Sequence, residues 1–237
     1  MSGKLPVVAI DGPVGSGKTT VARLAAKKLG YVLVDTGAIY RSVALKARQA
    51  DVDWNDADRL GELAANLDIR FEEGRDKQKV FLDGVEVTDA IREPEISQGA
   101  SEVSAHAPVR DALLDTQRDL GLSGGVVMEG RDIGTVVFPE AQVKAFVGAS
   151  IEIRVQRRFE ELKSKGKQVS LEDTLREVRL RDQRDEQRAL APLKPAEDAV
   201  LIDTGPLSAE EVADRVVALV SDFIEKETQI KHENHKS

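Results

Sequence analysis

The chain has 237 residues, a formal net charge of −8 and no cysteine. The lack of cysteine excludes disulfides and thiolate chemistry, and the acidic charge argues against a nucleic-acid partner, which would favour a basic surface. A chain of this length can form one α/β domain with insertions, or a core with small subdomains. It contains no secretory leader pattern and no apolar run of bilayer-spanning length, so we expect a cytoplasmic protein without a membrane partner.

The first predicted elements are a strand over residues 6–10 and a helix that begins near Gly17, joined by a glycine-rich turn. The turn has the spacing G-x-x-x-x-G-K-[ST], in which the glycines let the backbone curl round an anion and the helix adds its dipole. Lys18 is predicted to reach the β- and γ-phosphates, and the Thr19 hydroxyl to bind Mg²⁺. The alternative is an ordinary glycine-rich turn. The full spacing favours a nucleoside triphosphate site made of Gly12, Pro13, Val14, Gly15, Ser16, Gly17, Lys18, Thr19 and Thr20.

A second buried strand is predicted over residues 31–34, after a helix stop at Gly30. It brings the segment 35–41 to the carboxyl end of the sheet, where open α/β sheets bind ligands. Arg41 lies in the first turns of the next helix, which runs to about Ala50. It is a candidate ligand-binding residue, and the alternative is a solvated helix arginine.

The pattern changes between residues 51 and 92. A helix over residues 55–67 precedes strands over 67–71, 79–82 and 85–87, arranged around Gly74 and an Asp83-Gly84 turn. An antiparallel meander does not belong in a βαβα alternation, so we predict an insertion. Two helices follow, over residues 95–105 and 108–121, and they carry Ser101 and Arg110.

The next buried strand, over residues 126–128, ends in Glu129. An acid directly after an apolar strand is where phosphate-loop proteins hold Mg²⁺ or its waters. Arg131 and Asp132 therefore emerge at the same sheet edge as the phosphate loop, and the alternative is a polar turn with a local ion pair. Further strands are predicted over residues 143–147 and 199–202. A final helix runs from Ser208, which forms a capping box with Glu211, to about residue 223.

Two helices between these last strands form the most charged region, over residues 151–165 and 171–188. Arg181, Asp185 and Arg188 stand at i, i+4 and i+7 and share one face. On an exposed helix this spacing is often a salt-bridge ladder. Opposite a phosphate loop, it also fits a lid that supplies cations to a phosphoryl-transfer transition state.

Several motifs together make the sequence similar to the bacterial cytidylate (CMP) kinases, members of the nucleoside monophosphate (NMP) kinases. They are IDGPxGSGK, DTGAIYR, GRDIGTVVFP, RDxRD and the final APL…DAxxIDT…LS run, and the resemblance extends over residues 7–223. It implies an α/β fold with a five-stranded parallel core sheet, an NMP-binding domain containing the antiparallel insert, and a helical lid. The implied division is core over 1–39, 122–153 and 189–225, NMP-binding domain over 40–121 with the insert at about 63–102, lid over 154–188, and a flexible tail over 226–237.

The resemblance also implies roles for individual residues. ATP phosphates would lie on residues 12–20, with Arg157 and the loop after Asp203 beside the adenine and Mg²⁺ held by Thr19, with Glu129 acting through water. Thr36 stands where the family has Ser, which keeps the hydroxyl group. Glu129 stands where the family often has Asp, which keeps the carboxylate. The predicted substrate-binding residues are Arg41, Arg131 and Arg188 around the CMP phosphate, Ser101, Arg110 and Asp132 around the cytosine, Arg181 and Asp185 around the ribose, and in addition Thr36.

The implied reaction is in-line transfer of the γ-phosphoryl group of MgATP to CMP or dCMP, with Lys18, Arg131, Arg181 and Arg188 as the catalytic cations. We expect a monomer with small-molecule partners only. The alternatives are another small-acceptor phosphate-loop kinase and a GTPase-type switch protein, although the chain lacks the N-K-x-D motif that reads guanine. A nucleic-acid-binding ATPase is disfavoured because only 4% of residues are aromatic, which leaves few stacking platforms.

Overall fold

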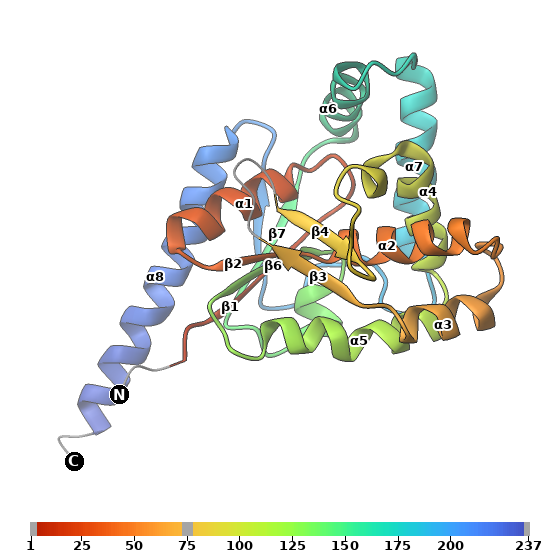
Figure 1. Cartoon of the computed structure of the whole chain (residues 1–237). Coiled ribbons are helices and arrows are strands. Elements are labelled where there is room, and N and C mark those ends of the chain that lie inside the picture. Colours follow the sequence, from red (N-terminus) through yellow and green to blue (C-terminus); the bar gives the residue numbers. More distant parts are fainter. Residues whose placement is uncertain (1–3, 73–77, 235–237) are drawn as a thin grey trace.

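The computed structural model describes residues 4–72 and 78–234. Its centre is a five-stranded parallel sheet in the order β2-β6-β1-β7-β8 (Figure 1). The strands are β1 (Val7–Asp11), β2 (Val32–Asp35), β6 (Val126–Gly130), β7 (Val143–Gly148) and β8 (Val200–Asp203). The five-stranded parallel core predicted from the sequence is therefore confirmed.

The central strand β1 shows how both faces of this sheet are buried. Val8 and Ile10 point to one face, where they pack with residues of α1 (Lys18–Leu29) and α8 (Ala209–Asn234). Val7 and Ala9 point to the other face, toward β6 and a π-helical turn at Ile133–Val137. Successive strand side chains alternate between faces, so a continuous apolar run buries both sides at once. The carboxyl end of β1 is thereby held at the middle of the sheet.

A second apolar cluster lies beside the sheet and is built from residues 38–113. It joins α2 (Thr36–Gln49), α3 (Ala57–Ala65), α4 (Pro94–Val103) and α5 (Ala107–Gly121). The predicted meander is present as an antiparallel sheet of β3 (Ile69–Glu72), β4 (Lys79–Leu82) and β5 (Val85–Glu86), followed by a 3-10 turn at Ala90–Arg92. The expected turn around Gly74 lies outside the described residues.

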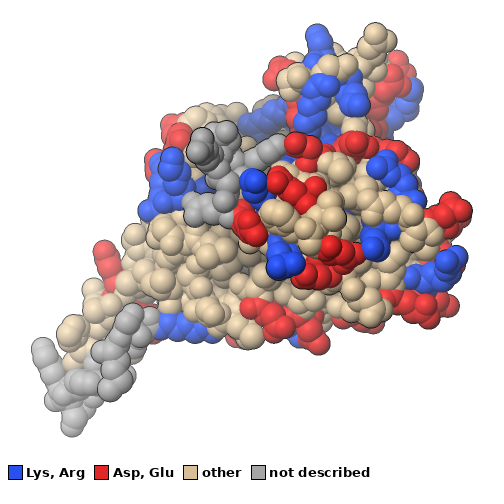
Figure 2. Space-filling view, viewed as in Figure 1, with Lys and Arg blue, Asp and Glu red and all other residues tan. Residues whose placement is uncertain are grey.

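Helices α6 (Ile151–Ser164) and α7 (Leu171–Gln187) project from the body (Figure 1). The apolar cluster that they share with the phosphate loop is small: among the described residues it contains Val14, Val155 and Val178. Positive and negative side chains are interspersed on these projecting helices (Figure 2).

The C-terminal helix differs from the prediction in length. The Ser208–Glu211 capping box is present, with the Glu211 amide 3.2 Å from the Ser208 hydroxyl and the Ser208 amide 2.8 Å from the Glu211 carboxylate. However, α8 continues to Asn234, well beyond the expected end near residue 223. Residues 226–234 are therefore helical and not an irregular tail, because good helix formers prolong the helix even where no apolar stripe requires it. Residues 235–237 lie outside the described part of the chain.

Among residues 4–72 and 78–234, no helix is long and apolar enough to cross a membrane.

Candidate active site

The phosphate loop joins β1 to α1 and begins the site. Gly17 precedes the helix with a left-handed φ of 85° and has no side chain to cap it, so the first N–H groups of α1 are left open for a ligand. Gly15 is also left-handed, with a φ of 73°. These two positions show why the motif needs glycine, since other residues are strained in this region.

The loop is also held at close range by its neighbours. A Cβ atom on Gly12 would lie 2.1 Å from the Val147 carbonyl oxygen, and one on Gly15 would lie 2.6 Å from that of Arg154. Both contacts are too short for a carbon atom. The loop is therefore wedged between β7 and α6, which fixes its curvature without a bound anion.

Lys18 lies inside this loop with its ammonium buried, 3.1 Å from the Pro13 carbonyl oxygen. Burial, assisted by the positive charge of Arg131, lowers the pKa of Lys18 to about 7, while Glu129 opposes the shift. Burial also raises the pKa of Glu129, as does the nearby charge of Asp35. The Glu129 Oε1 atom is buried and has no hydrogen-bond partner among the described residues.

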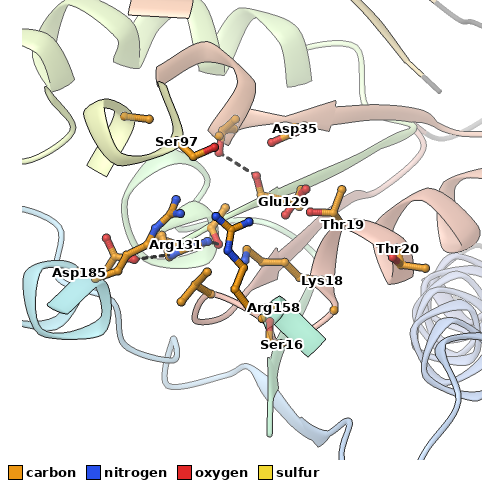
Figure 3. Close-up of a pocket in the computed structure, with 18 of the residues that line it drawn as sticks. Ser16, Lys18, Thr19, Thr20, Asp35, Ser97, Glu129, Arg131, Arg158 and Asp185 are labelled. Atoms are coloured by element: carbon orange, nitrogen blue, oxygen red, sulfur yellow. Dashed lines mark hydrogen bonds and ion pairs between the residues drawn. The ribbon is translucent and has the colours of Figure 1, made fainter. Parts of the chain in front are cut away.

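Each arginine predicted on the acceptor side, except Arg181, is held by a carboxylate from another part of the site. Arg41 Nη2 lies 2.6 Å from Asp35, and Arg131 Nε lies 2.7 Å from Asp185 (Figure 3). Arg188 lies 3.3 Å from Asp132. Such pairs hold long side chains in one orientation, so the cations are positioned before any ligand arrives.

The predicted stripe of Arg181, Asp185 and Arg188 does face the cavity, but no ion pair joins its members in the described structure. Burial alone would raise the pKa of Asp185, but the charges of Arg131 and Arg181 and the Arg131 hydrogen bond outweigh it and lower that pKa. Burial, with Arg131 nearby, lowers the pKa of Arg181 to about 10, and its Nε has no partner among the described residues. The stripe is thus directed into the site and is not a surface ladder.

Asp132 is the centre of a buried polar group at the other end of the cavity. One carboxylate oxygen accepts a hydrogen bond from Arg110, and the other lies 3.3 Å from Arg188. The Arg110 guanidinium also lies over the Tyr40 ring, 5.6 Å from its centroid. The Ser101 hydroxyl oxygen is buried nearby without a partner among the described residues. A free hydroxyl beside a fixed carboxylate forms a surface that can read the edge of a polar ring.

On the opposite side, Arg157 of α6 reaches the loop after β8. Its two terminal nitrogens lie 2.9 Å from the Thr204 hydroxyl and 2.7 Å from the Thr204 carbonyl oxygen. The Thr204 hydroxyl in turn donates to the Ser16 carbonyl oxygen at 3.0 Å. Arg157 therefore ties the projecting helices to the phosphate loop.

These groups line one cavity of about 650 Å³. All the site residues predicted from the sequence line it except Gly12 and Pro13, the first two residues of the phosphate loop. The cavity also contains residues that the sequence analysis did not identify: Tyr40, Arg92, Ser97, Ser104 and Arg158.

Comparison with known proteins agrees with this arrangement. The family model described as cytidylate kinase matches residues 8–222. The chain belongs to the cytidylate kinase family. Cytidylate kinases from Pseudomonas syringae pv. tomato and Geobacter sulfurreducens are each 50% identical to it, covering 92% and 90% of this chain and 96% and 92% of their own. A solved structure of an uncharacterized protein from Eubacterium ventriosum covers 93% of this chain and 99% of its own, with a TM-score of 0.50 and 13% identity, and it shares the fold alone.

Two of the unidentified cavity residues show what the sequence could not reveal. Arg92 is the last residue of the 3-10 turn and donates to the Thr88 carbonyl oxygen at 2.5 Å. Its pKa is lowered by burial and by the charge of Arg41. Arg158 is buried between Glu161 and Glu177, at 3.1 and 3.0 Å. In the sequence each is one arginine among many charged residues, and only the fold brings it to the cavity that this cytidylate kinase family member forms.

The oxygen atoms near the phosphate loop fit a magnesium ion. Mg²⁺ is usually held by one or two carboxylates together with substrate phosphates and water. Glu129 offers a buried oxygen without a partner, and Thr19 lines the same part of the cavity (Figure 3). The Thr36 hydroxyl, by contrast, donates to the Glu129 carbonyl oxygen at 2.7 Å, so it fixes the backbone of that residue. The described residues contain no group of three or more His, Cys, Asp or Glu side chains arranged for a metal.

Proposed function

We propose that this chain transfers the γ-phosphoryl group of ATP to CMP and to dCMP, which yields ADP and CDP or dCDP. Membership in the cytidylate kinase family supports the reaction and CMP as acceptor. The observation that carries the proposal is the single cavity that contains a phosphate loop, a set of carboxylate-held arginines and the buried Asp132 group. The phosphate loop and the Asp132 group would each hold one nucleotide, with the phosphates of the two between them.

In this reaction a phosphate oxygen of CMP attacks the γ-phosphorus of ATP, and the bond from that phosphorus to the β,γ-bridging oxygen breaks. The attacking oxygen is already ionised near neutral pH, so no general base is required. Catalysis then consists of holding the reactants in line and stabilising the transferred group. Exclusion of water from the closed cavity prevents hydrolysis of ATP.

Lys18 and three arginines are the groups that we assign to the transferred phosphoryl. Lys18 lies in the loop that would hold the β- and γ-phosphates. Arg131 and Arg181 are close enough to Lys18 for their positive charges to lower its pKa. Arg188 joins the Asp132 group to this region. The proposed Mg²⁺ would be held by Thr19, with Glu129 acting through water, and its role when bound is to offset charge on the ATP phosphates.

We assign the acceptor to the other half of the cavity. Arg41, Arg131 and Arg188 would surround its phosphate, with Thr36 holding the backbone of Glu129, and Arg181 and Asp185 would surround its sugar. Ser101, Arg110 and Asp132 would read the cytosine. An ionised carboxylate accepts hydrogen bonds and cannot donate, so Asp132 matches the amino group of cytosine and opposes the carbonyl oxygen of uracil.

We also propose that the projecting helices, within residues 154–188, act as a lid, and that residues 40–121 form an NMP-binding domain. The support is the separation of the apolar clusters: residues 38–113 form one, and the lid contributes to only a small one. Elements joined by few apolar contacts can move relative to one another at low cost.

An acceptor panel tests the proposed function. ADP production from MgATP would be measured with CMP, dCMP, UMP, AMP or shikimate, and without an acceptor. We expect CMP and dCMP to give the highest kcat/KM, and UMP to be at least about tenfold poorer, since an unpaired buried polar group costs about 1–3 kcal/mol. Faster turnover of AMP or shikimate would point to another small-acceptor kinase, and ADP release that is independent of any acceptor would contradict kinase activity.

A further inference from the structure

Asp11, at the carboxyl end of β1, is a buried carboxylate for which the reaction described above has no use. Its Oδ1 accepts a hydrogen bond from the Ile133 amide at 2.9 Å, and its Oδ2 accepts one from the Gly134 amide at 2.8 Å. Only 5% of the residue is exposed. Both of its oxygens are therefore occupied by backbone that lies more than a hundred residues further along the chain.

The backbone that Asp11 holds is the turn that carries Asp132. Asp132 occupies the residue before the Ile133–Val137 turn, where an aspartate usually accepts a hydrogen bond from the amide two or three residues further on, here that of Gly134 or Thr135. Its side chain makes no such bond here. Both of its carboxylate oxygens are instead directed to Arg110 and Arg188. The buried amides that follow would be left unpaired if no other acceptor were present, which is costly.

We propose that Asp11 is a positioning residue: it holds the Ile133 amide, takes over from Asp132 the capping of the Gly134 amide, and so leaves the Asp132 carboxylate free to read the cytosine. The inference rests on the base-reading role proposed for Asp132. Because Asp11 immediately precedes Gly12, it also links the phosphate loop directly to the base-reading turn.

Ionisation gives this arrangement a pH dependence. Burial raises the pKa of Asp11 to about 6, with a further contribution from Asp132, while the two amides and Arg131 lower it. Above that pH both oxygens accept. Below it, one oxygen carries a proton and no longer matches the amide that it faces, so the turn that carries Asp132 is held less firmly. Lys144 on β7 also faces this place, because its side chain and the Asp11 carboxylate both lie beside Gly134. Glu129 pairs with Ile10 and so lies on the other face of the sheet.

The test compares wild type with Asp11→Asn. The side-chain amide keeps one acceptor and places a donor against the other backbone amide. At pH 7.5 we expect CMP to bind at least about tenfold more weakly, as for one lost buried hydrogen bond, with ATP affinity within about twofold of wild type. The ratio of kcat/KM for CMP over UMP should fall by a similar factor.

The pH profile separates this role from a purely structural one. The ratio of CMP affinities between wild type and Asp11→Asn should shrink toward one as the pH falls from 7.5 to 5, because wild type then loses the same acceptor. The ionisations of the CMP phosphate, Lys18 and Glu129 are common to both proteins and cancel in this ratio. A ratio that stays constant with pH, or an equal loss for CMP and ATP, would overturn the proposal.

A double variant tests whether Asp11 acts through Asp132. Asp132→Asn alone should narrow the CMP-to-UMP ratio, and Asp11→Asn combined with Asp132→Asn should narrow it no further, since coupled residues are not additive. An unchanged ratio in Asp132→Asn would remove the base-reading role and this inference together. A changed ratio in Asp132→Asn with none in Asp11→Asn would leave the proposed function intact and overturn the role of Asp11 alone.

Asp182→Asn is the matched control, because Asp182 is also a buried carboxylate and pairs with Arg154 at 2.7 Å, away from the base-reading turn. Its CMP-to-UMP ratio and pH profile should follow wild type. Should Asp11→Asn not fold, the amide resonances of Ile133 and Gly134 in wild type give the same answer. We expect both to titrate near pH 6, and resonances that remain constant between pH 5 and 7.5 would refute the assignment.

Discussion

At the scale of single residues, the ligand-free site contains buried ionisable groups whose charged forms are destabilised by burial. Lys18 and Glu129 have opposite charges, and burial disfavours the charged form of each. The positive charge of Arg131 further disfavours the charged form of Lys18, whereas Arg131 itself forms an ion pair with Asp185. A polyanion placed in the phosphate loop would supply the negative charge that Lys18 lacks. The charges around Lys18 are therefore better compensated when a polyanion is bound than they are by the ion pairs of the ligand-free site.

This imbalance predicts proton uptake on ATP binding. With a pKa of about 7, Lys18 is largely neutral at pH 8.5 in the free protein, and ATP phosphates should raise its pKa well above that pH. Titration calorimetry at pH 8.5 in two buffers of different ionisation enthalpy should show uptake of close to one proton, and much less at pH 6, where Lys18 is already charged.

Lys18→Met is the control for this measurement. It should abolish the uptake and lower kcat by at least about a hundredfold, as for loss of a preorganised charge donor, while thermal unfolding remains cooperative. Equal proton uptake in both proteins would mean that another group titrates, and near-normal activity in Lys18→Met would contradict the role of the lysine.

The residue types of the site could be predicted from sequence, but their pairing could not. The sequence placed Arg131 and Asp132 at the sheet edge of the phosphate loop, and the family resemblance placed Asp185 at the ribose. The Arg131–Asp185 pair spans 54 residues, and local spacing contains no information about such a contact. Helical spacing allowed a salt-bridge ladder within the stripe of α7, whereas the fold gives Asp185 a partner from the residue that follows β6. Tertiary contact overrides local periodicity in such cases.

At the scale of elements, apolar patterns predicted where the strands and helices lie, but they did not predict where the last helix ends. The buried strands have period-two or continuous apolar runs that leave little alternative. The end of α8 has no such constraint. Its last turns, with Ile230 about half exposed, contribute no member to a buried cluster, so neither packing nor an apolar stripe marks where it ends.

Truncation after Lys226 tests this interpretation of α8. Residues 227–234 extend the helix, but the apolar members of the buried cluster on this face end at Val220 and Phe223. We expect the melting temperature to fall by no more than about 2 °C, since surface changes away from the core usually cost within about 0.5 kcal/mol. Helical circular dichroism should fall slightly, and kcat/KM for CMP should remain within about twofold.

A matched truncation after Asp214 provides the contrast. It removes Val216 and Val220 from the cluster that packs on α1, and it should prevent cooperative folding. A large loss of stability or activity in the shorter truncation, after Lys226, would mean that the end of the helix has a packing or binding partner.

At the scale of the whole molecule, the apolar clusters divide the protein into parts. Two clusters cover the faces of the parallel sheet, a third joins residues 38–113, and the small one of Val14, Val155 and Val178 connects α6 and α7 to the phosphate loop. The sequence predicted the insertion because a meander interrupts the βαβα order. It could not predict the relative strength of these contacts, since that depends on which apolar residues meet in three dimensions.

This division predicts closure of the projecting helices over the cavity when both nucleotides are bound. The chain has no cysteine, so a fluorophore pair can be attached at Lys167→Cys, between α6 and α7, and Gln98→Cys on α4, both exposed positions. We expect energy transfer to increase most with CMP and a non-hydrolysable ATP analogue together, because only the pair of ligands offers phosphates to the arginines of both parts. A second pair at Arg23→Cys and Asp222→Cys, on the packed helices α1 and α8, should show no change. If the first pair reports the same distance with and without both ligands, the helices are a fixed wall of the site and not a lid.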